Sequence, residues 1–287
     1  MAILPLGMVA GPLRTLASLT DGFGPTPKMP VLFLGHGSPM NAIEENVFVK
    51  GFRDTAALLP RPRAILCVSA HWETNGTFVT AMDEPRTIHD FGGFPPELYA
   101  VNYPAPGSPV LAALCSELIQ TTQVQPDLHW GLDHGAWSVI KHLFPKADIP
   151  VIQLSLDRKQ PPAYHYKLAR ELAPLREKGV LIVGSGNMVH NLRMVAWDKL
   201  NQAGFGFDWA IEAQQLMRKL ITEKQHHSLS EYQKLGAAMK LAIPTPEHYL
   251  PLLYVLAQQH ATDKLLFFND MPVAGSLTMT SVMLSAS

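Results

Sequence analysis

The segment Val31-Leu32-Phe33-Leu34-Gly35-His36-Gly37 decides the fold class, because an apolar run leads directly into a histidine flanked by glycines. A short continuous apolar run is typical of a strand buried on both faces of a parallel sheet. Two other runs end in the same way: Ile65-Leu66-Cys67-Val68 precedes His71, and Val180-Leu181-Ile182-Val183 precedes His190. Ligands bind at the carboxyl ends of the strands in open α/β sheets. The pattern therefore gathers imidazoles at one edge of the sheet and favours a metal-dependent enzyme.

Strand and helix signals alternate on both sides of this segment. Strands are expected at residues 30–35, 64–70, 77–81, 150–156, 180–184, 264–268 and 276–283. Helices are expected at residues 41–58, 108–121, 136–142 and 161–177, within 207–238, and from 246 or 247 towards 259. Such alternation predicts an α/β fold in a single domain, with a central parallel or mixed sheet flanked by helices and the metal site at the carboxyl ends of the strands.

Two Pro- and Gly-rich regions interrupt this regular pattern. Residues 1–28, which include Gly22-Phe23-Gly24-Pro25-Thr26-Pro27, are expected to form a loosely ordered N-terminal extension before a domain at residues 29–287. Residues 85–109 are expected to form a long loop, and loops of this length usually carry function.

Composition excludes several classes of protein. The chain has 287 residues, a formal net charge of −1 and no cluster of basic residues interleaved with aromatics, so we expect no nucleic-acid partner. Its two cysteines, Cys67 and Cys115, cannot form a disulfide framework and are expected in the core. No apolar stretch is long enough to span a bilayer, and the first residues lack the pattern of a secretory signal. We therefore expect a cytoplasmic protein that does not associate with membranes.

The chain contains 12 histidines, and their local sequence separates them into two groups. Seven lie in helical or polar segments without a companion motif and are expected at the surface or as hydrogen-bonded core residues: His89, His129, His142, His165, His226, His227 and His260. Five lie in turns rich in small residues, which allow a ligand to approach closely: His36, His71, His134, His190 and His248. Three imidazoles would suffice to hold a divalent metal, and two would remain for proton transfer. Spacing alone leaves the assignment open.

Several longer segments extend this pattern. In chain order they are Leu32-Phe33-Leu34-Gly35-His36-Gly37-Ser38-Pro39-Met40, Val68-Ser69-Ala70-His71-Trp72, Thr87-Ile88-His89-Asp90-Phe91-Gly92-Gly93-Phe94-Pro95, Tyr103-Pro104-Ala105-Pro106-Gly107-Ser108-Pro109 and Thr245-Pro246-Glu247-His248-Tyr249-Leu250-Pro251-Leu252. Their ordered occurrence over residues 29–284 resembles the class III extradiol ring-cleavage dioxygenases of the protocatechuate 4,5-dioxygenase β-subunit type, and among these the single-chain 4,5-DOPA extradiol dioxygenases.

The resemblance implies a ligand set. His36 and His71 fall on the two histidine ligands of the family, whose third ligand in the wider class is a glutamate. In this chain His248 aligns best with that position, and the neighbouring Glu247 is the alternative. Three neutral nitrogens suit both Fe(II) and Zn(II), so we expect Fe(II) for activity, and purified protein could hold Zn(II).

The resemblance also implies roles for the remaining histidines. His190 falls on the acid/base histidine of the family, although a histidine at a strand end could also reach the metal as a fourth ligand. His134 is expected to hydrogen-bond oxygen in the site or a substrate hydroxyl. Trp72, Tyr249 and the loop from Phe91 to Phe94 are candidates for stacking on an aromatic ring.

The implied reaction inserts both atoms of O2 into a small catechol. With DOPA the product would be 4,5-seco-DOPA, which cyclises to betalamic acid. Two alternatives remain open at this stage: a zinc-dependent hydrolase that uses a three-histidine site, and a non-catalytic metal-binding partner subunit. The protein is expected to be a monomer or a small homo-oligomer.

Overall fold

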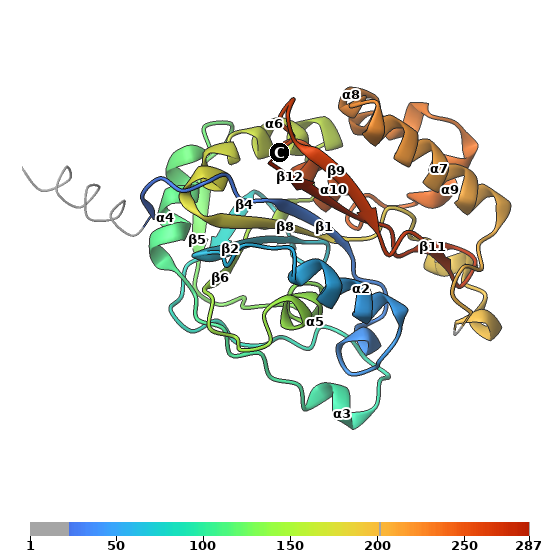
Figure 1. The fold of residues 1–287 in the computed structure, drawn as a ribbon, viewed down its shortest axis with the longest axis horizontal. Helices are drawn as coiled ribbons and strands as arrows, with labels where there is room; N and C mark the ends of the chain where they lie inside the picture. Colours follow the sequence, from blue (N-terminus) through green and yellow to red (C-terminus); the bar gives the residue numbers. More distant parts are fainter. Residues whose placement is uncertain (1–22, 201, 287) are drawn as a thin grey trace, which may run out of the picture.

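The computed structural model describes residues 23–200 and 202–286, and its centre is a six-stranded mixed sheet (Figure 1). The strand order is β6-β2-β8-β1-β12-β9. These strands span Val31–Gly35 (β1), Ala64–Ser69 (β2), Val151–Gln153 (β6), Val180–Gly186 (β8), Lys264–Phe268 (β9) and Ser281–Ser285 (β12). The first four strands of that order run parallel, whereas β12 is antiparallel to both β1 and β9. The predicted α/β fold with a parallel or mixed sheet is confirmed.

Short strands pair outside the central sheet. They are β3 (Glu73–Thr74) with β7 (Leu156–Asp157), β4 (Thr77–Thr80) with β5 (Val124–Asp127), and β10 (Pro272–Val273) with β11 (Leu277–Thr278). Two strands expected from sequence are therefore divided: residues 150–156 contribute to β6 and β7, and residues 276–283 contribute to β11 and β12.

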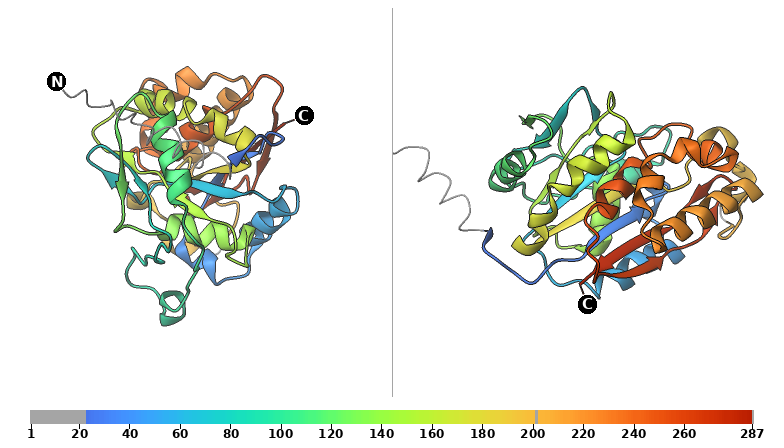
Figure 2. Two further views of the ribbon diagram at one scale, coloured as in Figure 1. Left: turned by 90° about the vertical axis from the view of Figure 1, so that its left-hand side faces the viewer. Right: turned by 90° about the horizontal axis from the view of Figure 1, so that it is seen from above.

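Helices cover both faces of the sheet (Figures 1 and 2). The α-helices are α2 (Val47–Ala56), α3 (Pro96–Tyr99), α4 (Pro109–Leu118), α5 (His134–Leu143), α6 (Pro162–Arg170), α7 (Asp208–Thr222), α8 (His226–Ser230), α9 (Ala237–Ala242) and α10 (Leu250–Leu256). Short 3-10 helices occur at Pro39–Ala42, Ala173–Lys178, Leu192–Met194, Trp197–Lys199 and Tyr232–Lys234. Among the described residues, no helix is both long enough and apolar enough to cross a membrane.

Alternation along the strands produces two apolar clusters, one on each side of the sheet. Leu66 and Ile182 pack with residues of α4, α6 and α10, whereas Ile65 and Leu181 pack with residues of α2 and α5. Successive strand residues point to opposite faces, so a strand covered on both sides must be apolar throughout. This requirement explains the uninterrupted apolar runs, and Cys67 and Cys115 are buried free thiols within these clusters, as expected.

The helix expected at residues 41–58 is shorter in the structure. A 3-10 turn ends at Ala42, and α2 begins only at Val47 because Asn46 caps it, accepting hydrogen bonds from the backbone N–H groups of Phe48 and Val49. A capping side chain satisfies donors that a longer helix would satisfy internally, so it fixes the first turn.

Of the expected N-terminal extension, residues 1–22 lie outside the described residues. Residues 23–28 run along the body of the protein: Phe23 is buried in the core, and the backbone N–H of Thr26 donates to the carbonyl of Glu177. The guanidinium of Arg63 donates to the carbonyl of Gly24.

Parallel pairing of β2, β8 and β1 brings their carboxyl ends to one place. Gly35 pairs with Gly186, and Ser69 pairs with Ser185. Beyond the strands, the backbone N–H of His36 donates to the carbonyl of Gly186, and that of Ala70 donates to Ser185. The register therefore sets the segments that carry His36, His71 and His190 side by side.

Candidate metal centre

Three histidines from distant segments converge at this sheet edge. His36 follows β1, His71 follows β2, and His248 precedes α10. Each offers a ring nitrogen, and these atoms all lie within 4.8 Å of one another. Their ring centroids are 5.0 to 5.2 Å apart. These are the three residues that the sequence resemblance selected as metal ligands.

A hydrogen-bond relay determines which nitrogen of His36 carries the proton. Nδ1 of His36 lies 3.0 Å from the hydroxyl of Ser185, and that hydroxyl donates its one hydrogen to the carbonyl of Gly135. Because Ser185 has no second hydrogen, Nδ1 of His36 must donate to it. Nε2 of the neutral ring is then left with a free lone pair, directed at Nε2 of His71 at 3.3 Å.

Carboxylates face the Nδ1 atoms of the other two rings. Nδ1 of His71 lies 3.5 Å from Oδ2 of Asp90, and Nδ1 of His248 lies 3.1 Å from Oε1 of Glu247. A carboxylate behind a ring favours the tautomer with hydrogen on the facing nitrogen, which leaves the other nitrogen free to bind a metal. All three histidines are thus arranged to present Nε2.

This donor set fits a divalent metal. Free lone pairs of His36 and His71 face each other at 3.3 Å, an arrangement that is repulsive unless a cation or a proton lies between them. A proton is disfavoured, because burial and then the neighbouring histidines lower the pKa of His36 and of His248 well below the usual value. Burial, followed by the charge of His134, lowers the pKa of His71 to about 4. The rings are neutral near pH 7, as metal ligands must be.

His190 reaches the same site, in a different arrangement. Its backbone bridges to Leu277 and donates to the carbonyl of Ala242. Its ring lies flat against that of His248, with centroids 3.5 Å apart and planes inclined by 8°. A ring nitrogen of His190 forms a possible metal-binding group with Glu247 and His248 rather than with His36 and His71. Burial is the main cause that lowers the pKa of His190 to about 4.

His134 completes the set of five glycine-associated histidines. It is the first residue of α5, whose N-terminus is capped by the carboxylate of Asp133. Its ring lies against that of His71, with centroids 3.9 Å apart, and the edge of Phe91 meets it at 5.4 Å. All five histidines selected from sequence therefore lie in one cluster.

Two glycines allow this close packing. A Cβ on Gly135 would lie 2.5 Å from Oγ of Ser69 and 2.7 Å from Cδ2 of His71. A Cβ on Gly186 would overlap the carbonyl oxygen of His248, which accepts a hydrogen bond from the backbone of Asn187. The small residues around the histidines are thus required by the approach of one segment to another.

Sequence reasoning missed two polar residues of the site. Asp90 lies within the family motif at residues 87–95 but receives no role from the sequence, and Ser185 lies in no motif that indicates a function. Asp90 lies in the expected functional loop, which was the available signal for it. The position of Ser185, one residue before the end of β8, carries no signal, because its partner His36 follows another strand.

Comparison with known proteins agrees with this geometry. Residues 29–264 match the family described as catalytic LigB subunit of aromatic ring-opening dioxygenase. The chain belongs to this family. The prediction of an extradiol ring-cleavage dioxygenase is thereby confirmed, and the family together with the histidine cluster indicates dependence on a metal.

Relatives of high similarity carry a consistent name. The protein named 4,5-DOPA dioxygenase extradiol of Escherichia coli K12 is 46% identical over 259 residues, which cover 89% of this chain and 94% of the relative. A protein of the same name from Beta vulgaris is 38% identical over 77% of this chain and 83% of the relative. The crystal structure of an uncharacterized protein from E. coli K12 matches with a TM-score of 0.78 and 40% identity, over 90% of this chain and 100% of that chain.

Of the aromatic residues considered for substrate stacking, only the loop residues remain accessible. Trp72 is buried and stacks on Trp130 with centroids 5.7 Å apart. Tyr249 is buried, and its hydroxyl donates to the carbonyl of Leu229. Both are packing residues. Phe91 is half-buried at the edge of the histidine cluster, in contact with Phe94.

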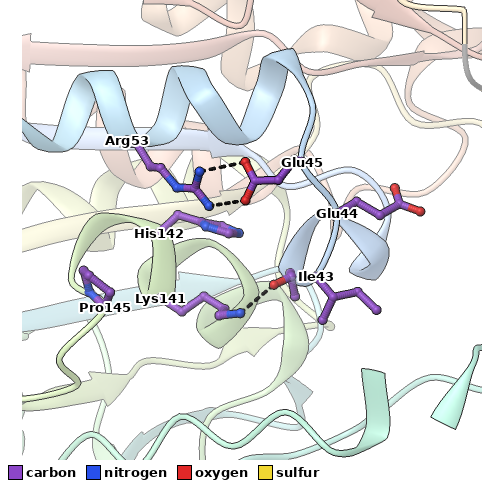
Figure 3. A pocket seen from close by; sticks show the side chains of 8 residues that line it. Ile43, Glu44, Glu45, Arg53, Lys141, His142 and Pro145 are labelled. Atoms are coloured by element: carbon purple, nitrogen blue, oxygen red, sulfur yellow. Dashed lines mark hydrogen bonds and ion pairs between the residues drawn. The ribbon is translucent and has the colours of Figure 1, made fainter. Parts of the chain in front are cut away.

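A surface pocket of about 450 Å³ lies at the carboxyl end of α5 and is separate from the cluster of five histidines (Figure 3). Three of its charged groups have partners: Arg53 forms two hydrogen bonds to Glu45, and the ammonium of Lys141 donates to the carbonyl of Ala42. His142 also lines the pocket. Among the described residues, its ring forms a hydrogen bond only with the backbone, between Nε2 and the carbonyl of Asn41 at 2.8 Å. The residues that line the pocket therefore stabilise the segment that leads into α2, and they do not resemble a catalytic site.

Proposed function

We propose that this chain is a metal-dependent extradiol dioxygenase that inserts both atoms of O2 into a small catechol, with DOPA as substrate. The product would be 4,5-seco-DOPA, which leads to betalamic acid. The observation that carries the proposal is the shared orientation of His36, His71 and His248, whose Nδ1 atoms meet outer acceptors and whose remaining nitrogens converge. The names of the relatives support DOPA as the substrate.

His36, His71 and His248 would hold the metal, which we propose to be Fe(II) in the active enzyme, while purified protein can contain Zn(II). When bound, the metal supplies a common site for the catechol oxygens and O2 and lowers the pKa of the catechol. The absence of a carboxylate among the three ligands leaves the site one negative charge short of a two-histidine, one-carboxylate site. Asp90 and Glu247 restore negative charge directly behind two of the ligands.

We assign acid/base chemistry to His190 rather than metal binding. The ring of His190 stacks face to face on that of His248, with centroids 3.5 Å apart and 8° between the planes. A ring nitrogen of His190 forms a possible donor group with Glu247 and His248 that includes neither His36 nor His71, so His190 would not join those two ligands in holding the metal. A neutral His190 can instead accept a proton from a catechol hydroxyl.

His134 would contact the reactants from the side of His71. Its Nδ1 faces Asp90 at 3.0 Å, which leaves Nε2 for a hydrogen bond to oxygen or to a substrate hydroxyl. Phe91, which borders His134, is the side chain best placed to contact the aromatic ring of a substrate.

The decisive experiment is anaerobic reconstitution of the purified chain with Fe(II), followed by O2 uptake with DOPA and other catechols and by detection of a yellow product. We expect one O2 consumed per catechol cleaved. Full iron loading without O2 uptake on any catechol would refute the proposal. Hydrolytic activity of the zinc form without O2 would instead indicate a zinc hydrolase, and metal binding without either activity would indicate a non-catalytic metal-binding subunit.

The ligand assignment has its own test. His36→Ala and His71→Ala should each lower the metal content of the protein, whereas His227→Ala should not, because the side chain of His227 is 86% exposed. Full metal occupancy in His36→Ala would refute the assignment of that ligand.

A further inference from the structure

Asp90 faces two histidines of the proposed site, although it comes from a different segment of the chain. It belongs to the long loop between β4 and α4, and its side chain is only 18% exposed. The rings of His71 and His134 that it faces are 3.9 Å apart between centroids. One carboxylate is thus placed against two adjacent imidazoles.

The two oxygens of Asp90 have separate partners. Oδ2 lies 3.5 Å from Nδ1 of His71. Oδ1 accepts a hydrogen bond of 2.8 Å from the backbone N–H of His134 and lies 3.0 Å from Nδ1 of the same residue. Within the part of the chain that the structure describes, that buried Nδ1 has no hydrogen bond of good geometry, so Asp90 is the group that faces it.

We propose that Asp90 is a positioning residue that fixes the tautomer and orientation of His71 and His134 together. This inference rests on the proposed function, in which His71 is a metal ligand and His134 contacts the reactants. A carboxylate can only accept hydrogen bonds, so it favours the tautomer of each ring with hydrogen on the Nδ1 that faces it. Both Nε2 atoms then keep a free lone pair. A single carboxylate thus links the orientation of the proposed metal ligand His71 to that of its neighbour His134.

The adjacent residue extends the effect. Phe91 packs edge-to-face with His134, so the loop contacts that ring through both Asp90 and Phe91. The same loop therefore supplies the carboxylate that orients the histidines and the aromatic side chain that borders the site. Partners of this kind behind metal-ligating histidines typically change metal affinity or activity 10- to 100-fold when they are lost.

Asp90→Asn separates this role from a purely structural one. Asparagine keeps an oxygen that can accept the backbone N–H of His134 at the start of α5. Its amide, however, presents hydrogens to Nδ1 of His71 and favours the wrong tautomer. Asp90→Ala removes both functions. Glu97→Gln is the matched control, because Glu97 is an exposed carboxylate in α3 on the same loop.

The first measurement is Zn²⁺ affinity of the full chain by competition with a chelator, together with Tm of the metal-free protein. We expect Asp90→Asn to weaken Zn²⁺ binding about 10- to 100-fold with little change in Tm. Asp90→Ala should weaken binding and also lower Tm, and Glu97→Gln should change neither. Asp90→Asn that binds Zn²⁺ like the wild type, while only Asp90→Ala loses stability, would show that Asp90 merely caps α5.

The second measurement is ¹⁵N NMR of the histidine rings in metal-free protein, which reads the tautomer directly. We expect hydrogen on Nδ1 of His71 and His134 in the wild type and a shift towards Nε2 in Asp90→Asn. Unchanged tautomers in Asp90→Asn would overturn the inference. Because neither metal nor substrate is present, this result is independent of the proposed function, which would fail separately if the wild type bound no metal.

Discussion

The imidazole of His190 lies parallel to that of His248, with ring centroids 3.5 Å apart and 8° between the planes. The proposed acid/base residue therefore lies against a proposed metal ligand, although the two residues have different proposed roles. The contact also holds His190 at the edge of the three-histidine site, next to Glu247 and His248.

Replacement of His190 should therefore affect turnover and not metal content. His190→Ala is expected to lower kcat about 10²- to 10⁴-fold, the usual contribution of a positioned acid or base, while metal per chain stays at the wild-type value. His248→Ala should lose metal. Metal analysis and O2 uptake on the two variants check this. Equal loss of metal from both would make His190 a fourth ligand.

Glu247 should support His248 without replacing it. Its Oε1 lies 3.1 Å from Nδ1 of His248 and also accepts a hydrogen bond from the hydroxyl of Thr245. Glu247→Gln is expected to weaken metal affinity by about tenfold, less than His248→Ala, because a neutral amide oxygen accepts more weakly. Chelator competition measures both, with Glu44→Gln as an exposed control. Retention of metal by His248→Ala together with its loss from Glu247→Gln would make Glu247 the ligand.

Gly186→Ala should disturb the site by steric overlap. The added Cβ would press on the carbonyl of His248 and force the segment before α10 to move. We expect a loss of stability of about 1–3 kcal/mol and reduced metal affinity, as for other overpacked positions. Gly92→Ala is the control, because a Cβ there meets nothing within 4 Å. Urea unfolding of both variants checks the stability, and a wild-type midpoint in Gly186→Ala would contradict the packing described.

His165 should make stability depend on pH. It is fully buried between the hydroxyl of Tyr254 and the carbonyl of Asp157, and burial lowers its pKa to about 4. The unfolded chain, with a histidine pKa near 6.5, binds the proton more readily. Stability is therefore lost as pH falls from about 6.5 towards 4, at up to about 1.4 kcal/mol per pH unit for one proton.

The variant His165→Gln isolates this contribution from that of the other buried histidines. Urea unfolding of metal-free protein between pH 4.5 and pH 7 should give a shallower pH dependence for His165→Gln than for the wild type. Identical slopes for the two proteins would mean that His165 is protonated equally in the folded and unfolded chains.

Sequence patterns predicted the sheet and the histidine cluster because both follow from local rules. A strand covered by helices on both faces must be apolar throughout, so a short apolar run indicates such a strand, and a parallel sheet collects the residues that follow its strands. His248 follows no strand, so only the family motif selected it. Its approach to the cluster depends on contact between the α10 segment and Gly186, which no periodicity encodes.

The acceptors behind the histidines could not be predicted in this way. Asp90 comes from an irregular loop, where side-chain direction depends on each backbone dihedral in turn. Ser185 lies inside a strand, where the same residue type commonly has no function. Similarly, the division of residues 276–283 into β11 and β12 depends on tertiary contacts: β11 pairs with β10, and β12 pairs with β1 and β9.

The position of β12 has a consequence for the order of synthesis. Among the described residues the last strand lies inside the sheet, between β1 and β9, and Met279 just before it packs over Gly35 and Gly37 beside His36. The residues of β1 therefore leave the ribosome long before their partner strand β12. A copy truncated before Ser281 would leave the edges of β1 and β9 open, which makes it a substrate for proteolysis rather than a slower enzyme.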